Sequence, residues 1–168
     1  MISEQTPQTS PALSAQALER FAREVAKYPA DQAQSAVMAC LTIVQEELGF
    51  VSAESEKVVA DYLGIPAIAA LEVATFYNMY ELEPMGKYKI TVCTNISCML
   101  RDSDCIVERL NQRLGIGFNE TTADGKFTLK EGECMGACGG APLFHVNNSK
   151  MYEFLTPEKV DQILEELK

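Results

Sequence analysis

The sequence is poor in histidine and in basic residues. Among 168 residues there is one histidine, His145, and 14 lysines and arginines stand against 24 aspartates and glutamates, a formal net charge of −10. Nucleic-acid binding needs a basic surface, so this balance argues against a DNA- or RNA-binding protein. A Rieske-type site needs two histidines, so a single histidine excludes it. No Ser–His–Asp or Cys–His catalytic set is recognisable by motif either. We expect His145 to be a strand residue near the functional site.

Membrane-spanning, targeting and nucleotide-binding segments are also missing. No apolar run approaches the length of a transmembrane helix, and residues 1–11 are polar, without a basic residue or an apolar centre. We therefore expect a disordered tail over residues 1–13 rather than a secretion signal or transit peptide. Neither G-x-G-x-x-G after a strand nor G-x-x-x-x-G-K-S/T is present. The sequence predicts a cytoplasmic protein without direct membrane insertion and without its own nucleotide site.

The first half of the chain is predicted to form a helical bundle over residues 14–80. Apolar residues recur at helical spacing, Ser14 is a candidate N-cap, and Gly49 and Gly64 are candidate C-caps. Residues 1–86 carry a charge of −8 and residues 87–168 only −2. We expect the acidic half to serve mainly in docking a partner protein. The expected helices run from Ser14 to about Tyr28 with Leu18, Phe21, Ala22 and Val25 inward, from about Asp31 or Ala33 to Gly49, from Ala53 to Leu63, and from Pro66 towards Tyr77.

The second half is predicted to be an α/β domain over residues 87–168, after a linker at 81–86 that contains Pro84 and Gly86. The expected order is β-α-β followed by β-β-α, which is that of the thioredoxin fold. The fold class is therefore α+β, an N-terminal helical bundle followed by a thioredoxin-like α/β domain with a mixed four- to five-stranded sheet. The expected strands are 87–92, 127–129, 143–146 and 151–155, the last two joined at Asn147-Asn148, and the helices are 103–114 and a final one capped by Thr156-Pro157.

Four of the six cysteines form two close pairs. Cys93 and Cys98 follow a predicted strand with four residues between them, while Cys134 and Cys138, with three between, lie in a glycine-rich segment. In a reducing compartment such pairs favour metal or redox chemistry over disulfides. Zinc ribbons usually use C-x2-4-C and redox dithiols C-x-x-C. The spacing favours a four-thiolate iron–sulfur site, with structural zinc and a thiol–disulfide relay as the alternatives.

An iron–sulfur site needs backbone N–H donors near its sulfurs and limited access of water. Glycines beside the second pair permit close backbone approach, and Met99 and Leu100 are expected to cover one side of the site. Ala141-Pro142 is expected to hold a proline against the ligand loop, and its peptide bond is a candidate for the cis form. Cys40 is expected to be a buried core thiol and Cys105 a helix residue away from the site. The expected surrounding residues are Asn95 and Ser97 in a loop between the first ligands, Met99, Met135, Gly136, Gly139 and Pro142.

Two motifs resemble known proteins. Cys93-Thr-Asn-Ile-Ser-Cys98, with Glu133-Cys-Met-Gly-Ala-Cys-Gly-Gly-Ala-Pro142, is similar to the ligand segments of the thioredoxin-like [2Fe–2S] ferredoxins. Val73-Ala-Thr-Phe-Tyr77, after Leu63-Gly-Ile-Pro66 and a helical bundle, resembles the E-subunit family of bacterial respiratory complex I. The resemblance runs from about residue 14 to residue 168. Asp102 departs from it, because many members have a small residue there.

The resemblance implies an electron-transfer subunit of NADH:quinone oxidoreductase (an NADH dehydrogenase and translocase) that is not catalytic alone. FMN and NADH would bind only to the partner subunit, and the complex would hold the chain at the inner face of the plasma membrane. Alternatives from the same family are diaphorase subunits of NAD-linked hydrogenases or formate dehydrogenases; from other classes, a zinc-stabilised adaptor and a thioredoxin-like disulfide oxidoreductase. The ligands that the resemblance implies for one [2Fe–2S] cluster, which exchanges single electrons with the partner's FMN, are Cys93, Cys98, Cys134 and Cys138.

Overall fold

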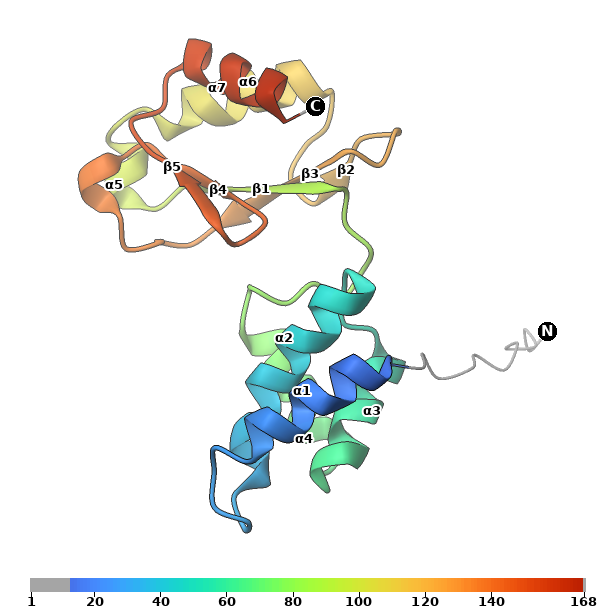
Figure 1. Cartoon of the computed structure of the whole chain (residues 1–168). Coiled ribbons are helices and arrows are strands. Elements are labelled where there is room, and N and C mark those ends of the chain that lie inside the picture. The colour runs from blue at the N-terminus through green and yellow to red at the C-terminus, as the bar shows by residue number, and fades with distance from the viewer. Residues whose placement is uncertain (1–12, 168) are drawn as a thin grey trace, which may run out of the picture. The chain divides into compact units, whose positions relative to one another are not determined.

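A computed structural model describes residues 13–167. The chain divides into two compact units, one ending at Pro84 and the other beginning at Met85 (Figure 1). The tail expected over residues 1–13 falls almost wholly on residues 1–12, outside the described part. Within residues 13–167, no helix has the length and apolar character needed to span a bilayer.

The first unit consists of helices whose ends agree with the caps predicted from the sequence. The Ser14 hydroxyl accepts a hydrogen bond from the Ala17 N–H at 3.1 Å, which begins the first helix. Gly49 and Gly64 end two later helices with φ of 85° and 67°, a left-handed conformation that glycine adopts without strain. Ser52 caps the helix that ends at Gly64. The elements are α1 (Ala15–Val25), η1 (Ala33–Ala36), α2 (Val37–Leu48), α3 (Ala53–Leu63) and α4 (Ala67–Phe76).

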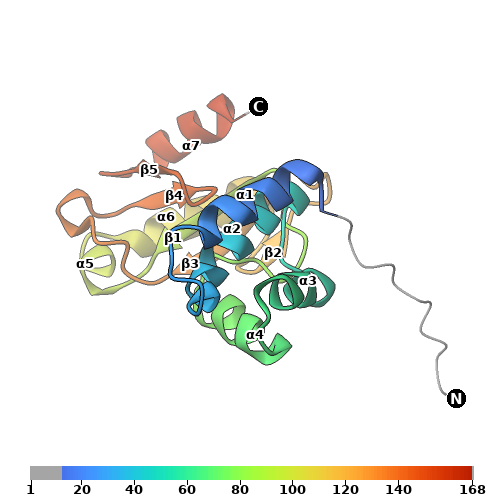
Figure 2. The ribbon, with the colours of Figure 1, turned by 60° about the horizontal axis from the view of Figure 1, so that its bottom comes forward.

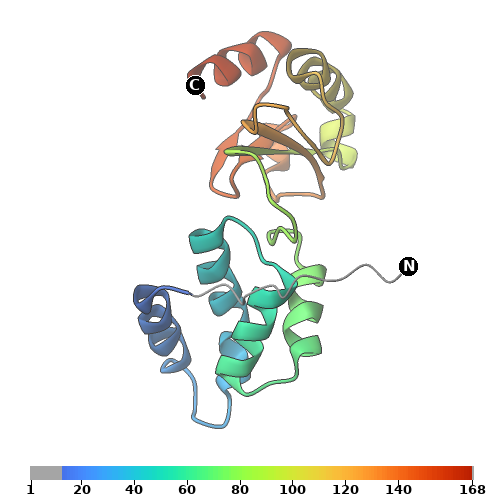
Figure 3. The same ribbon diagram turned by 90° about the vertical axis from the view of Figure 1, so that its right-hand side faces the viewer.

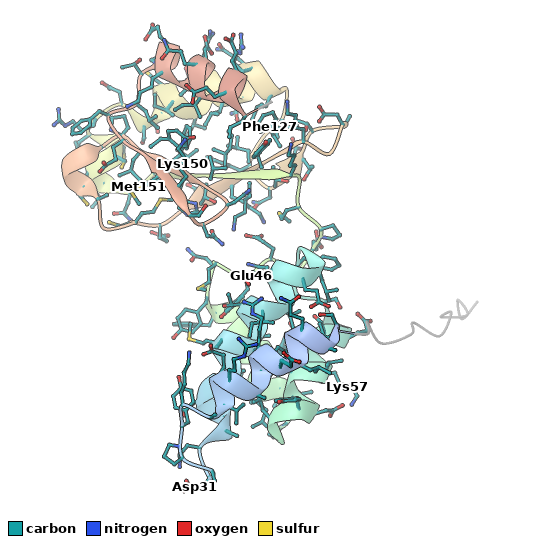
Figure 4. The ribbon with its side chains drawn as sticks, in the orientation of Figure 1. Asp31, Glu46, Lys57, Phe127, Lys150 and Met151 are labelled. Atoms are coloured by element: carbon teal, nitrogen blue, oxygen red, sulfur yellow. The ribbon has the colours of Figure 1, made fainter. Side chains whose placement is uncertain are left out.

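The buried face of α1 agrees with the expected one at Phe21 and Val25 but not at Leu18 and Ala22. Ala17 and Phe21 are buried, whereas Leu18 and Ala22 are exposed. Polar contacts also join α1 to α2, because the Ser14 N–H and hydroxyl both donate to the Glu47 carboxylate. Arg20 also pairs with Glu46 at 2.5 Å, and Figure 4 shows Glu46 on the side of α2 near α1. The apolar pattern along α1 could not reveal these polar contacts.

The second unit is built on a five-stranded mixed sheet, which confirms the predicted fold class. The strand order is β2-β3-β1-β4-β5, with β1 parallel to β3 and all other neighbours antiparallel. Asn147, Asn148 and Ser149 join β4 to β5. Asn147 and Asn148 have φ of 52° and 53°, and the Ser149 N–H donates to the Val146 C=O at 3.1 Å, which closes a tight turn. Lys150 and Met151 lie on β5 (Figure 4). The strands are β1 (Tyr88–Cys93), β2 (Glu120–Thr121), β3 (Phe127–Gly132), β4 (Phe144–Val146) and β5 (Lys150–Tyr152).

Two long helices lie side by side over one face of this sheet (Figures 1 and 3). They are α6 (Ser103–Leu114) and α7 (Pro157–Glu166), and the Thr156 hydroxyl caps α7 as predicted. Ile106 and Leu110 of α6 share a hydrophobic core with residues of α7 and of the strands. Among residues 13–167, the residues of this core all belong to the second unit. The first unit has a core of its own, which includes Phe21 and Val44.

Candidate metal centre

The sheet delivers both cysteine pairs to the same edge. Cys93 is the last residue of β1, and in the register of the parallel pair it lies opposite Gly132, the last residue of β3. Cys134 follows Gly132 by two residues. Because parallel strands end at the same edge, β1 and β3 carry the first and second pairs to one place.

The first pair is buried. Cys93 is 2% exposed and Cys98 1%, and the two thiols are hydrogen-bonded to each other. The segment between them is not the expected loop, because Ile96–Met99 forms the short helix α5. Asn95 caps it, its side-chain oxygen accepting from the Ile96 N–H at 3.0 Å. One helical turn then brings Cys98 back to Cys93.

The backbone of Leu143 contacts both cysteines of the first pair. Its C=O accepts from the Cys93 N–H at 3.1 Å, and its N–H donates to the Cys98 thiol. Leu143 follows the Ala141–Pro142 peptide bond, which is cis as the sequence suggested, and Pro142 is buried. Burial, with a smaller contribution from the bond to Cys93, raises the pKa of Cys98 to about 11, while the Leu143 N–H acts in the opposite direction. Without a metal, Cys98 is therefore a neutral thiol at pH 7.

The second pair is exposed and already close together. The Sγ atoms of Cys134 and Cys138 are 3.5 Å apart, near the ~3.8 Å that two sulfurs would have on one tetrahedral ion with metal–sulfur bonds of about 2.3 Å. Gly136, at φ 76°, directs its N–H to the Cys134 sulfur. This hydrogen bond, and after it the contact with Cys138, lowers the pKa of Cys134. The loop thus favours a thiolate at Cys134.

Side-chain hydrogen bonds join the two ligand segments. The Asn95 amide donates to the Glu133 carboxylate at 2.9 Å, and the Thr94 hydroxyl donates to Glu131 at 2.8 Å. Cys138 is near enough to Cys98 for its charge to affect the pKa of that thiol. The two cysteine pairs therefore lie close to each other.

The chemistry of these donors fits a two-iron cluster. Among residues 13–167, no three Cys, His, Asp or Glu side chains are placed so that they could share one metal ion. A structural zinc needs four ligands around one centre, whereas the two irons of a [2Fe–2S] cluster share four cysteines between them. Two separate close pairs of cysteines meet the requirement of the two-iron cluster. The donors present are thus compatible with a [2Fe–2S] cluster.

Not all of the other residues expected around the site are buried. Met135 packs against the small core formed by Cys93, Cys98, Ala141 and Leu143. Met99 and Leu100, 49% and 74% exposed, do not cover the site as expected, because Cys98 takes the inward side of α5; Ser97 is exposed as well. A Cβ at Gly139 would meet nothing within 4 Å, whereas one at Gly140 would collide with the Glu153 side chain.

Cys40, Cys105 and His145 lie in the kinds of element that the sequence predicted. Cys40 is fully buried in the first unit, and burial together with the nearby Glu24 raises the pKa of its thiol to about 12. Cys105 is exposed on α6. His145 is half-buried on β4, opposite Thr91 of β1. Neither Cys40 nor Cys105 takes part in a disulfide.

The sequence did not reveal that Leu143 and Gly132 contribute to the surroundings of the cysteines. Leu143 acts through its backbone, which no residue type signals. A Cβ at Gly132 would lie 2.7 Å from the Thr91 Cγ2 and 2.8 Å from the Met135 Cε. A glycine ending a strand two residues before a ligand was the available signal of such a close approach.

The thioredoxin-like [2Fe–2S] ferredoxin family matches residues 21–168. The E subunit of the NADH-quinone oxidoreductase of Rickettsia bellii (strain RML369-C) is 42% identical over 145 residues, 86% of this chain and 86% of the relative. NADH dehydrogenase [ubiquinone] flavoprotein 2, mitochondrial, of Dictyostelium discoideum is 40% identical over 145 residues, 86% of this chain and 58% of that protein.

Among solved structures, the NAD⁺-reducing [NiFe]-hydrogenase in the H₂-reduced state is similar with a TM-score of 0.68 and 18% identity. The match covers 79% of this chain and 22% of the hydrogenase chain, so this chain spans about a fifth of the hydrogenase chain that it matches. At this identity the likeness shows the fold alone. The family match and the identity to the curated relatives, taken with the two cysteine pairs at one sheet edge, show that the chain belongs to the thioredoxin-like [2Fe–2S] ferredoxin family.

Proposed function

We propose that this chain is the electron-transfer subunit of an NADH:quinone oxidoreductase and holds one [2Fe–2S] cluster. The observation that carries the proposal is the delivery of two cysteine pairs to one sheet edge by parallel β1 and β3. The name and the 86% coverage of the relative from Rickettsia bellii support the choice of enzyme. The proposed ligands are Cys93, Cys98, Cys134 and Cys138.

The two pairs would each hold one iron. A [2Fe–2S] cluster, when bound, accepts and releases one electron at a time. The chain's own contribution is to bring the four sulfurs together and to direct N–H groups at two of them. The N–H of Gly136 points at Cys134 and that of Leu143 at Cys98, and such donors favour added negative charge at the sulfurs.

The electrons would come from FMN on a separate NADH-oxidising subunit, because this sequence has no dinucleotide or P-loop motif. We propose that the helical unit contributes mainly to binding that subunit. Its helix α4 buries only Ala70 and Ala74, while Ile68, Leu71 and Phe76 are exposed. These three lie at spacings of 3 and 5 along the helix, and Phe76 is 79% exposed. Exposed apolar side chains gathered on one element mark protein contacts.

Through the complex, the chain would lie at the cytoplasmic face of the plasma membrane without inserting into it. A diaphorase subunit of an NAD-linked hydrogenase or formate dehydrogenase is the second candidate, with the same chemistry at this chain. The hydrogenase likeness supports it at the level of fold, whereas 42% identity supports the quinone-reducing enzyme.

Metal analysis tests the cluster. Protein purified without oxygen should contain about 2 iron and about 2 acid-labile sulfide per chain, and dithionite should produce a paramagnetic signal. Each of Cys93→Ser, Cys98→Ser, Cys134→Ser and Cys138→Ser should lower cluster content or change that signal. Cys105→Ser, at an exposed cysteine of α6 that is not a proposed ligand, should not. Zinc without sulfide would contradict the proposal.

A further inference from the structure

We propose that the redox partner docks on the end of the second unit around Cys134 and Cys138, over an apolar collar formed by Ile96, Met99, Leu100 and Phe154. The inference rests on the proposed function and names the surface through which the site exchanges electrons. Cys134 and Cys138 are exposed while Cys93 and Cys98 are buried. A partner that must come close to the site therefore has to approach from the side of the second pair.

The first part of the collar is the outer face of α5. Ile96, Met99 and Leu100 are spaced i, i+3 and i+4, so they share one side of this short helix. Ile96 is 66% exposed and Leu100 74%. Figures 1 and 2 both place α5 beside η2 (Cys138–Gly140), the turn that carries the last ligand. Three large apolar side chains in five residues, facing water next to a redox site, are typical of a surface that another protein covers.

The second part of the collar is Phe154, which has an unusual backbone. Its φ is 51°, a left-handed conformation that bulky residues rarely adopt, and yet its ring is 62% exposed. The Phe154 N–H donates to the Gly140 C=O at 2.6 Å, so the residue is attached to the end of η2. The strain is not compensated by burial of the ring. Strained residues of this kind cluster at functional sites, where the strain holds a side chain in a required place.

The charges beside the collar indicate which kind of partner fits. Acidic residues outnumber basic ones there: the acidic residues are the exposed Asp102, Glu131, Glu133 and Glu153, and the basic residues are Arg101 and Lys159. A second copy of this chain would bring acidic groups against acidic groups, and an anionic lipid surface would also be repelled. A protein subunit with an apolar contact centre and lysine or arginine at its margin matches both features. The flavin-bearing subunit is expected to present such a surface.

The test uses the full chain with its cluster and the flavin-bearing subunit of the same enzyme. Phe154→Asn removes the ring, but asparagine tolerates the left-handed conformation and keeps the N–H that bonds to Gly140. Leu100→Ser removes the most exposed apolar side chain of α5. We expect each variant to keep its cluster signal and its unfolding midpoint, and to bind the partner at least tenfold more weakly. Phe154→Tyr and the exposed Gln162→Ser on α7 should bind like the wild type.

The outcomes separate this inference from the proposed function. If the wild-type chain, with its cluster, does not bind the flavoprotein, the proposed function and the collar both fail. If it binds and the two collar variants bind equally well, the collar alone is wrong. The wild type could also self-associate in sedimentation or bind to anionic vesicles. If the collar variants abolish either behaviour, the collar has a different occupant and the proposal is overturned.

Discussion

The six thiols of this chain share one chemistry, yet their surroundings give them different roles. Cys40 is fully buried among apolar residues of the first unit, and Cys105 is exposed on α6. We predict that Cys40→Ala lowers the free energy of unfolding by about 1–2 kcal/mol, because it leaves a small cavity. Cys105→Ser should change it little. Urea unfolding measures both, and loss of the visible cluster absorption in either variant would mean that a ligand has been misassigned.

Two glycines near the ligands provide a matched pair. Gly132→Ala would place a Cβ within 3 Å of Thr91 and Met135 side-chain atoms, whereas Gly139→Ala meets nothing within 4 Å. We predict that Gly132→Ala destabilises the protein by about 1–3 kcal/mol through overpacking. Gly139→Ala should leave the unfolding midpoint of the metal-free protein nearly unchanged. Equal midpoints for the two variants would show that the strand end relaxes around the added methyl group.

At the scale of elements, α6 and α7 are held together by an ion pair as well as by their apolar faces. Arg109 makes a bidentate contact with Asp161, and Arg113 approaches the same carboxylate at 3.4 Å. The hydrogen bond from Arg109 lowers the pKa of Asp161. A carboxyl group whose pKa is lower in the folded state stabilises the fold above its unfolded pKa of about 3.9, and the contribution disappears as pH falls through the lowered folded value.

The change Asp161→Asn should therefore destabilise the protein at pH 6–7 and make progressively less difference below about pH 4. Unfolding free energies of the two proteins, measured over this range, test the prediction. Asp31→Asn, at an exposed carboxylate of the first unit (Figure 4), is the control. A difference between wild type and Asp161→Asn that does not depend on pH would show that the carboxylate acts by packing alone.

The elements that the sequence did not reveal are short or lack a pattern. α5 has four residues, too few for a helical repeat, and its one local signal is the capping Asn95. β2 is a pair of exposed residues, Glu120 and Thr121, without alternation of apolar and polar positions. Longer helices that end at a glycine, such as α3 and α6, were predicted with the bounds that the structure shows. At the site, spacing and glycine content indicated the four cysteines, but which residues face outward on α5 depended on Cys98 turning inward.

At the scale of the whole chain, the two units have separate cores, and the boundary lies at Met85. We predict that a chain starting at Met85 assembles the cluster with the same paramagnetic signal as the full protein. The same fragment should fail to co-purify with the flavoprotein, because it lacks the exposed apolar residues of α4. Partner binding as tight as that of the full chain would show that the helical unit is not needed for docking.

The contacts that Leu143 makes with Cys93 and Cys98 can survive substitutions in the sequence. Both come from its peptide groups, so no side-chain substitution at position 143 can remove them, and only proline would delete the N–H. Random mutation can replace Asn95 or Met135 and lose what they contribute. The bonds from Leu143 persist for as long as β4 pairs with β1. Part of the environment of the sulfurs is thus determined by the fold rather than by the residue types. Sequences that have diverged widely can therefore still retain it.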